Sequence, residues 1–196
     1  MLGFSLTTLG SHVSTLDDLV QACTEMIAKD GLAAFSLRKV AQRVGIKAPS
    51  IYEHFASKEA LLGEARRSAT VALNESLLAH CKGRGARQRL VSTAVGYLQF
   101  AQEQPSLFAL LLMETPSRRR GLEEPPDKNS PYAFLLARVN DFLGEGQRNG
   151  EVLSFGIWSL VHGAAVLRHT HLKEFSAPVV AGTRKNLEAL LDGWQA

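Results

Sequence analysis

The chain has 196 residues, enough for one compact domain or for a small domain joined to a larger one. Hydrophobic residues make up 45% and charged residues 21%, as in an ordinary soluble folded protein. The net charge of +3 is too small for a surface that coats nucleic acid throughout. The two cysteines, Cys23 and Cys81, form no Cys-x-x-Cys pair, so we expect reduced thiols and neither a disulfide framework nor a metal site.

The sequence also argues against secretion and against a membrane span. No Lys or Arg precedes Lys29, whereas a secretory signal begins with basic residues. The uncharged run from Val152 to Leu167 has 16 residues, short of the roughly 20 that cross a bilayer. We therefore expect a cytoplasmic protein without membrane contact.

The first predicted helix follows an extension, residues 1–14, that has no strong pattern. Ser14 or Thr15 can cap the helix, and Gly31 follows its end. Its apolar residues recur on one face at Leu16, Leu19, Val20, Cys23 and Ile27.

Residues 36–55 predict two short helices separated by a tight turn. Gly45 occupies the turn, where a residue that tolerates a positive φ angle is favoured. Ala41 is small enough for two helices to cross closely, and Ile51 and Phe55 supply the inward face of the second helix. A short helix, a tight turn with glycine and a second helix together form the helix-turn-helix unit. The second helix of such a unit enters the DNA major groove.

Charge is concentrated in the same segment. Residues 36–58 contain five basic residues and one acidic residue, whereas residues 1–30 contain one basic and four acidic residues. A local basic cluster is what phosphate contacts require. An ordinary helical hairpin with a solvated basic face is the alternative.

The remaining pattern is helical and contains no convincing strand or internal repeat. Helices are predicted over 57–82, with Ser57 as the cap, and over 86–104, 106–113 and 132–148. Two more begin near Ser154 and at Pro178, and residues 118–131 read as a mobile loop. The prediction is an all-α chain with an N-terminal three-helix head over residues 1–60 and a larger helical bundle over 61–196.

Five segments between residues 36 and 61 together resemble the TetR family of bacterial transcriptional regulators. They are Ser36-Leu37-Arg38, Val40-Ala41, Gly45-Ile46, the run from Ala48 to Phe55, and Ser57 to Leu61. Gln104-Pro105-Ser106-Leu107-Phe108 is similar to a proline-led short helix of that family. Trp158 to Gly163 resembles the Trp-x-x-x-His-Gly signature of one class of its C-terminal domains.

This resemblance implies a homodimeric, ligand-responsive repressor that a small, mostly apolar effector releases from a pseudo-palindromic double-stranded DNA operator. This sequence departs from many family members in two ways. Lys47 stands where Ser or Thr is common, and the residues before the first helix contain no basic arm. Residues expected to meet DNA are Ser36, Arg38, Lys47, Ala48, Pro49, Ser50, Tyr52, His54 and Lys58.

The body's aromatic residues suggest a mostly apolar effector pocket with a polar handle, although most of them are expected in the core. The candidate lining residues are Tyr97, Phe100, Phe108, Phe134, Arg138, Trp158 and His162. An apolar stripe near the C-terminus can be core, while the resemblance favours a dimer interface. That predicted interface comprises Trp158, His162, Val180, Leu187, Leu190, Leu191 and Trp194.

Two other classes of function compete with a regulator. An enzyme would draw on His162, His169 and His171, yet His162 and His169 lie about 10 Å apart along a helix and no carboxylate pair or phosphate loop is evident. We therefore expect no enzyme activity, cofactor or metal. A ligand-sequestering or scaffolding protein that has lost DNA binding is the other alternative, and the intact basic segment argues against it.

Overall fold

The computed structural model describes residues 15–112, 126–144, 149–172, 174, 176 and 178–195, and within them the regular structure is entirely helical. The all-α prediction is confirmed. The chain divides into two compact units, one up to Ala65 and one from Arg66 onward. The predicted extension before Thr15 and most of the predicted 118–131 loop lie outside the described residues.

The N-terminal unit packs α1 (Thr15–Asp30), the 3₁₀ helix η1 (Leu32–Ala34), α2 (Leu37–Val44) and the 3₁₀ helix η2 (Ala48–Glu53) around one small core. α1 packs on α2, and α2 packs on η2. The buried side chains come from α1, α2, η2 and the residues after η2, and they include Leu19, Cys23, Ile27, Val40, Ala41, Ile51 and Phe55. Burial raises the pKa of the Cys23 thiol to about 12, so this cysteine is an inert core residue.

The turn after α2 forms as the sequence predicts. Gly45 has φ 82° and ψ 22°, the left-handed conformation that glycine adopts without a steric penalty. Its N–H bonds to the Gln42 carbonyl at 3.3 Å, and the Ile46 N–H bonds to the Ala41 carbonyl at 3.0 Å. These bonds satisfy the last carbonyls of α2 and direct the chain back towards it.

The helix α3 (Lys58–His80) begins in the first unit and continues into the second. The predicted cap is confirmed, because Ser57 Oγ accepts a hydrogen bond from the Ala60 N–H at 3.1 Å. α3 is the helix that directly follows the helix-turn-helix segment in the chain.

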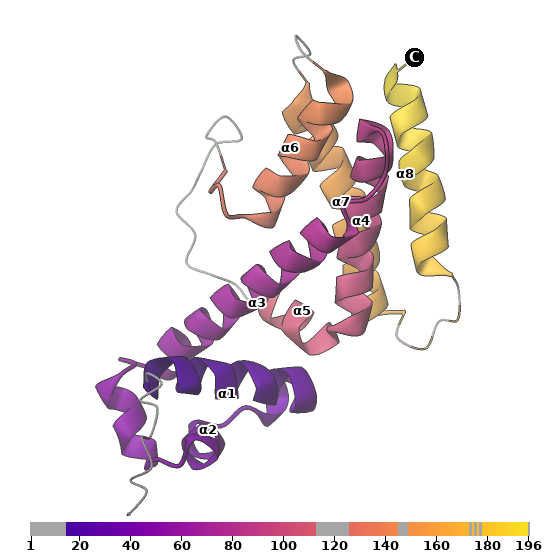
Figure 1. The fold of residues 1–196 in the computed structure, drawn as a ribbon. Helices are drawn as coiled ribbons and strands as arrows, with labels where there is room; N and C mark the ends of the chain where they lie inside the picture. The colour runs from indigo at the N-terminus through magenta and orange to yellow at the C-terminus, as the bar shows by residue number, and fades with distance from the viewer. Residues whose placement is uncertain are drawn as a thin grey trace, which may run out of the picture. The chain divides into compact units, whose positions relative to one another are not determined.

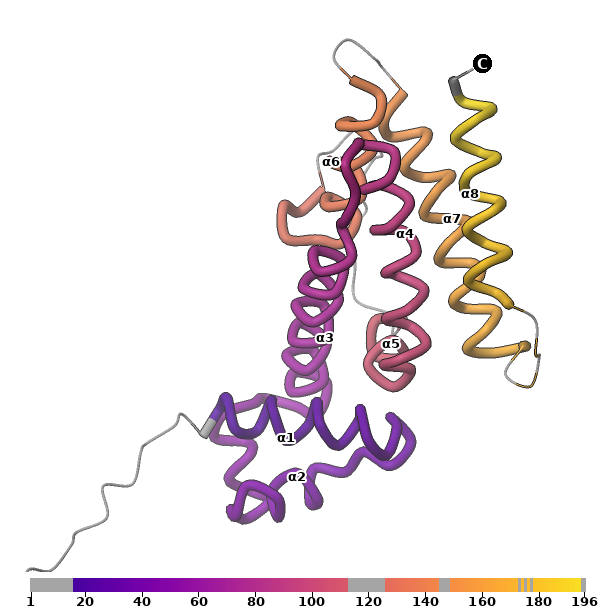
Figure 2. Tube along the Cα trace, turned by 45° about the vertical axis from the view of Figure 1, so that its right-hand side comes forward, coloured from indigo at the N-terminus to yellow at the C-terminus, as the bar shows by residue number. Residues whose placement is uncertain are grey.

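The second unit also contains α4 (Ala86–Glu103), α5 (Pro105–Leu111), α6 (Pro131–Leu143), α7 (Gly150–His169) and α8 (Val179–Gln195). α4 packs against α5, α6, α7 and α8, so it is the central helix. α6 and α8 each also pack against α7, and α8 runs beside α4 and α7 (Figures 1 and 2).

Two predicted helix boundaries were wrong. α6 ends at Leu143 rather than Arg148, because Gly144 has φ 81° and interrupts the helical path. α7 begins at Gly150 rather than Ser154, and the Ser154 side chain is fully buried within the helix. A Cβ at position 150 would lie 2.3 Å from the side-chain oxygen of Asn140 on α6, so the Asn140 side chain would have to move.

Among the described residues, α7 alone meets the length and composition of a membrane-crossing helix, with 20 residues and a mean hydropathy of 1.4. Core helices of soluble proteins meet the same criterion, and α7 packs against α4, α6 and α8. The helix is longer than the uncharged run because it includes Glu151 and Arg168.

Candidate DNA-binding and ligand-binding sites

The segment expected to read DNA is the short 3₁₀ helix η2, which two buried side chains fix to the core of the first unit. Ile51 is fully buried and Phe55 is 5% exposed, so both anchor η2 to the core of the unit. Tyr52 stands on the opposite face and is 59% exposed. The Tyr52 ring is therefore accessible to a partner such as DNA.

The remaining predicted DNA-contacting residues of this segment are also accessible. Lys47, Pro49 and His54 are exposed, and Ala48 and Ser50 are half-buried. Lys47 occupies the N-cap position of η2, in extended conformation and without a side-chain capping bond. Its ammonium group is therefore not needed to hold the helix end.

Two further predicted residues flank this surface. Arg38 is exposed in the first turn of α2. Ser36, at the N-cap of the same helix, is half-buried. Lys58 is exposed at the start of α3, with its ammonium 5.1 Å from the centre of the Phe35 ring. This cation–π contact restricts the lysine while leaving it accessible to an anion.

One basic residue of the cluster has a structural partner that the sequence did not reveal. Arg43 Nη2 lies 2.8 Å from Glu25 Oε2, which links α2 to α1. Both side chains are close to half exposed, so the pair adds only about 0.2–1 kcal/mol to stability. Neither residue was predicted to contact DNA.

An aromatic cluster occupies the interior of the second unit. Tyr97 Oη of α4 lies 2.7 Å from His162 Nδ1 of α7, and the Phe108 ring of α5 meets Tyr97 edge-on at 5.8 Å between centroids. Trp158 packs against Tyr132 of α6 at 5.0 Å. The structure thus brings together four of the predicted effector-lining residues, and adds Tyr132, which was not predicted.

Burial controls the protonation of Tyr97 and His162. It raises the pKa of Tyr97 and lowers the pKa of His162, so both groups favour their neutral forms. A neutral His162 that carries its proton on Nε2 can accept a hydrogen bond from the Tyr97 hydroxyl at Nδ1. The pair is therefore a polar contact inside an apolar environment.

The space beside this cluster is small. A void of about 30 Å³ lies between α3, α4, α6 and α7, and its lining includes Leu77, Thr93, Tyr97, Leu135 and Trp158. Such a volume holds about one water molecule, whereas ligand pockets span roughly 300–1,000 Å³. An effector can enter here only if the surrounding helices separate.

Three predicted lining residues lie elsewhere. Phe100 is buried on α4. Phe134 and Arg138 form a cation–π pair on α6 at 5.3 Å, and Arg138 also pairs with Asp141 at 2.8 Å. None of these three lines the void or the cavity described next.

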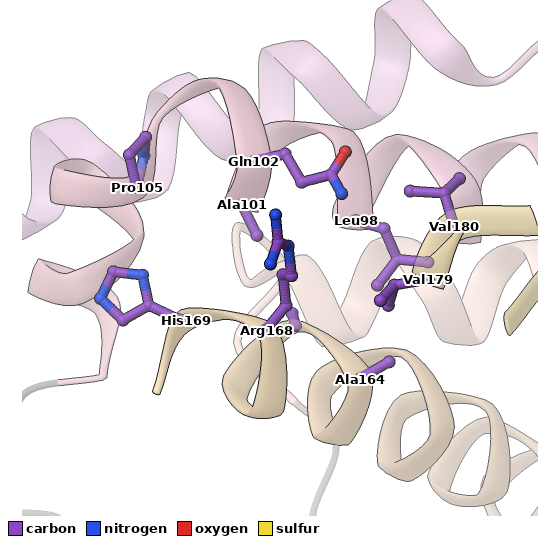
Figure 3. A pocket seen from close by; sticks show the side chains of 10 residues that line it. Leu98, Ala101, Gln102, Pro105, Ala164, Arg168, His169, Val179 and Val180 are labelled. Carbon is purple, nitrogen blue, oxygen red and sulfur yellow. The ribbon is translucent and has the colours of Figure 1, made fainter. Parts of the chain in front are cut away.

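A larger cavity, of about 530 Å³, lies between α4, α5, α7 and α8 (Figure 3). Its walls are mostly apolar, with three polar side chains, Gln102, Arg168 and His169. The apolar lining consists of Leu98, Ala101, Pro105, Ala164, Ala165, Val179 and Val180. Residues from four separate helices meet here, so no local sequence pattern could have indicated it.

Part of the predicted dimer interface is buried within the single chain. Leu187 and Leu191 of α8 are 1% and 0% exposed within a single chain, so they belong to its own core and have no surface for a second copy. Trp158 and His162 turn inwards to the aromatic cluster. The remaining members, Val180, Leu190 and Trp194, are half-buried.

Exposed apolar side chains also lie along α7. Val152, Phe155 and Leu167 are 61%, 60% and 48% exposed. Ser159 and Gly163 fall on the same helical face between them, which makes a stripe at intervals of three and four residues. A stripe of this kind is typical of a helix that packs against a partner.

Comparisons with known proteins agree with this arrangement. Residues 19–65 match the family described as bacterial regulatory proteins, tetR family, and residues 90–192 match the tetracyclin repressor-like C-terminal domain. Among solved structures, a Rhodococcus sp. RHA1 protein of unknown function has a TM-score of 0.73 at 21% identity, over 95% of this chain and 98% of that one.

Two relatives are named as HTH-type transcriptional regulators. The uncharacterized HTH-type transcriptional regulator YobS of Bacillus subtilis is 22% identical over 89% of this chain and 90% of its own length. The HTH-type transcriptional repressor KstR2 of Mycolicibacterium smegmatis is 41% identical over 60 residues, which is 31% of this chain and 29% of its own. The chain belongs to the TetR family of DNA-binding, ligand-responsive transcriptional regulators, which are regulators rather than enzymes.

Proposed function

We propose that this protein is a cytoplasmic, homodimeric repressor that a small, mostly apolar effector releases from a pseudo-palindromic operator. The observation that carries the proposal is the helix-turn-helix unit, in which Ile51 and Phe55 are buried while Tyr52 stands exposed beside Lys47 and His54. Function divides along the chain, with DNA binding in residues 1–60 and dimerisation and effector binding in residues 61–196.

DNA contact divides into base reading and phosphate binding. Lys47, Ala48, Pro49 and Ser50 begin η2, the end of a recognition helix that meets base edges. The Ala48 methyl group suits contact with a thymine methyl group. The other predicted contacts meet phosphates or sugars, which position the protein without specifying sequence. They are Ser36, Arg38, Tyr52, His54 and Lys58, and the Lys47 ammonium also contacts a phosphate.

The outer faces of α7 and α8 form the proposed dimer interface. The stripe of Val152, Phe155 and Leu167 supplies the apolar contact. On α8, Gly182 and Gly193 have open space around them, and Leu190 packs beside Gly156 of α7. Small residues next to an apolar stripe let two helix pairs approach closely, as in a four-helix bundle. A two-fold dimer then pairs with two operator half-sites.

The aromatic cluster is the proposed site for the apolar effector, with His162 as its polar handle. Trp158, His162 and Gly163 carry the Trp-x-x-x-His-Gly pattern of one class of family C-terminal domains. The adjoining void includes Leu77 of α3, so an effector that widens it displaces this helix. Because α3 begins at Lys58, directly after the helix-turn-helix segment, its displacement changes how that segment meets DNA.

In vitro transcription from the promoter of this protein's own gene tests repression. Added protein lowers the transcript yield, and an effector restores it. A yield that rises with added protein identifies an activator. A yield that is unchanged, although the protein binds the promoter specifically, rejects direct control of transcription at that site.

A panel of apolar and aromatic compounds tests the effector site by thermal unfolding. A ligand that binds only the folded protein stabilises it by mass action. At a concentration a hundred times its Kd, the free energy of unfolding increases by about 2.7 kcal/mol, which raises the midpoint temperature. The shift should diminish in a Trp158→Ala variant and persist in a Phe134→Ala variant, since Phe134 lies outside the void. If no compound shifts the midpoint at high concentration, an apolar effector is excluded.

A further inference from the structure

The cavity between α4, α5, α7 and α8 has the size of a ligand site and is separate from the aromatic void. Its volume of about 530 Å³ lies within the usual range for small-molecule pockets. The void beside Tyr97 shares none of its lining residues. Binding at this cavity can therefore be examined independently of the effector site proposed above and of DNA binding.

Arg168 is the central polar feature of this cavity. It lies in the last turn of α7, and its side chain extends across the space towards Gln102 of α4 (Figure 3). Arg168 Nη1 also donates a hydrogen bond to the Leu172 carbonyl, which holds the guanidinium in this position. A guanidinium presents a planar set of five N–H donors, whose geometry matches a carboxylate.

The charge of the surroundings favours an anion. A second cavity, of about 580 Å³, shares Gln102, Arg168, Val179 and Val180 with the first and adds Arg184 of α8. Among the described residues that line the two cavities there are two arginines, one histidine and no carboxylate. Of these two arginines, Arg168 lines both cavities, whereas Arg184, which pairs with Glu188 at 3.0 Å, lines the second alone.

The rest of the cavity favours a hydrocarbon. Leu98, Ala101, Ala164 and Ala165 form its walls on α4 and α7, and Val179 of α8 faces them (Figure 3). Because Ala101 of α4 and the adjacent Ala164 and Ala165 of α7 are small, the two helices leave space between them instead of filling it with side chains. Occupying this space with an apolar chain removes its surface from water.

We propose that this cavity binds an anionic amphiphile, a monocarboxylate with an unbranched or compact apolar body. The carboxylate pairs with the Arg168 guanidinium near Gln102, where the two cavities join. The apolar body lies against the alanine and valine walls. The recognised chemistry is thus one negative head group attached to a saturated chain of medium length.

Calorimetric titration of the full-length protein with decanoate and with the neutral decan-1-ol tests the proposal. We expect decanoate to bind at least about tenfold more tightly than the alcohol, since a charge-assisted bond is stronger than a neutral one. Arg168→Met removes this preference, whereas Arg168→Lys retains part of it. Lys185→Met is the matched control, because Lys185 is exposed on α8 and lines neither cavity.

A second variant keeps the test valid if Arg168→Met disturbs the turn after α7. Ala164→Leu fills the apolar part of the cavity, so both ligands should lose affinity while the thermal midpoint stays equal or rises. Tyr97→Phe should leave decanoate binding unchanged. Equal affinity of the wild type for decanoate and decan-1-ol overturns the proposal, as does absence of binding or undiminished decanoate binding in Ala164→Leu.

Discussion

The Tyr97 hydroxyl on α4 and Nδ1 of His162 on α7 lie 2.7 Å apart, although 65 positions separate the residues in the sequence. The bond lies inside the aromatic cluster, where burial lowers the pKa of His162 below its ordinary value of 6.5. Protonation of His162 would remove the acceptor of this bond and place a charge among apolar rings. The pair therefore makes the stability of the second unit sensitive to acid.

The pH dependence of stability has a definite sign. Between the ordinary pKa of 6.5 and the lower folded-state pKa of His162, the unfolded chain binds a proton that the folded chain does not. The free energy of unfolding should therefore fall as pH decreases from about 7 through this window, and level off below it. Urea unfolding at a series of pH values measures the slope, and His162→Gln should show less of it. Identical slopes in both proteins would contradict the assignment.

Gly45 and Gly63 form a matched pair that tests the turn. Gly45 has φ 82°, so Gly45→Ala should destabilise the helix-turn-helix unit by roughly 1–2 kcal/mol. Gly63 lies within α3 with open space around it, and Gly63→Ala should stabilise by about 0.5–1 kcal/mol. Thermal unfolding compares the two variants. An unchanged or raised midpoint in Gly45→Ala would show that the turn does not require glycine.

The proposed dimer interface predicts the response to a charge on α7. Phe155 is 60% exposed in the single chain, so Phe155→Glu should leave folding intact but convert dimer to monomer. Val71→Glu, at a 56% exposed position on α3, provides a control of similar exposure and should remain dimeric. Sedimentation velocity distinguishes the species. Dimers in both variants would exclude the outer face of α7.

Lys47 tests the phosphate contacts. Neutralising one phosphate contact lowers the slope of log Kd against log salt by about 0.9. Lys47→Ala should therefore bind the operator more weakly and with a salt slope smaller by about one. Lys29→Ala is the control, since this exposed lysine lies on α1 outside the helix-turn-helix segment. A slope unchanged in Lys47→Ala would remove this residue from the phosphate contacts.

The helix-turn-helix unit could be predicted because its determinants are local. Gly45 sets the turn, and the spacing of Val40, Ala41, Ile51 and Phe55 decides which side chains are buried. Each of these features lies within one short segment, so periodicity and backbone preference suffice to predict it. The family resemblance was correct for the same reason.

The outer face of α7 could not be predicted in the same way. α7 is apolar around most of its circumference, so its periodicity does not indicate which side faces the core. Trp158 and His162 seemed suited to an interface, yet they face α6 and α4, while Phe155 is exposed. On α8, Leu187 and Leu190 are three positions apart, and only tertiary packing buries the first and leaves the second partly accessible.

The Arg168 cavity depends on tertiary structure entirely. Its lining residues are mostly alanines and valines, with a leucine, a proline and three polar side chains, and they are spread over four helices. None forms a motif in the sequence, and their common location follows from how α4, α7 and α8 pack.

Fluorescence anisotropy on DNA from upstream of this protein's own gene tests the central claim most directly. The titration compares wild type with Tyr52→Ala, and the upstream DNA with a scrambled sequence, across a series of salt concentrations. Tyr52 is exposed, so the variant should keep its fold by circular dichroism. We predict tight binding of the wild type to the upstream DNA, at least about a thousandfold above scrambled DNA, and a clear loss in Tyr52→Ala. Equal, weak binding to both DNAs that Tyr52→Ala does not change would contradict specific DNA recognition by this helix.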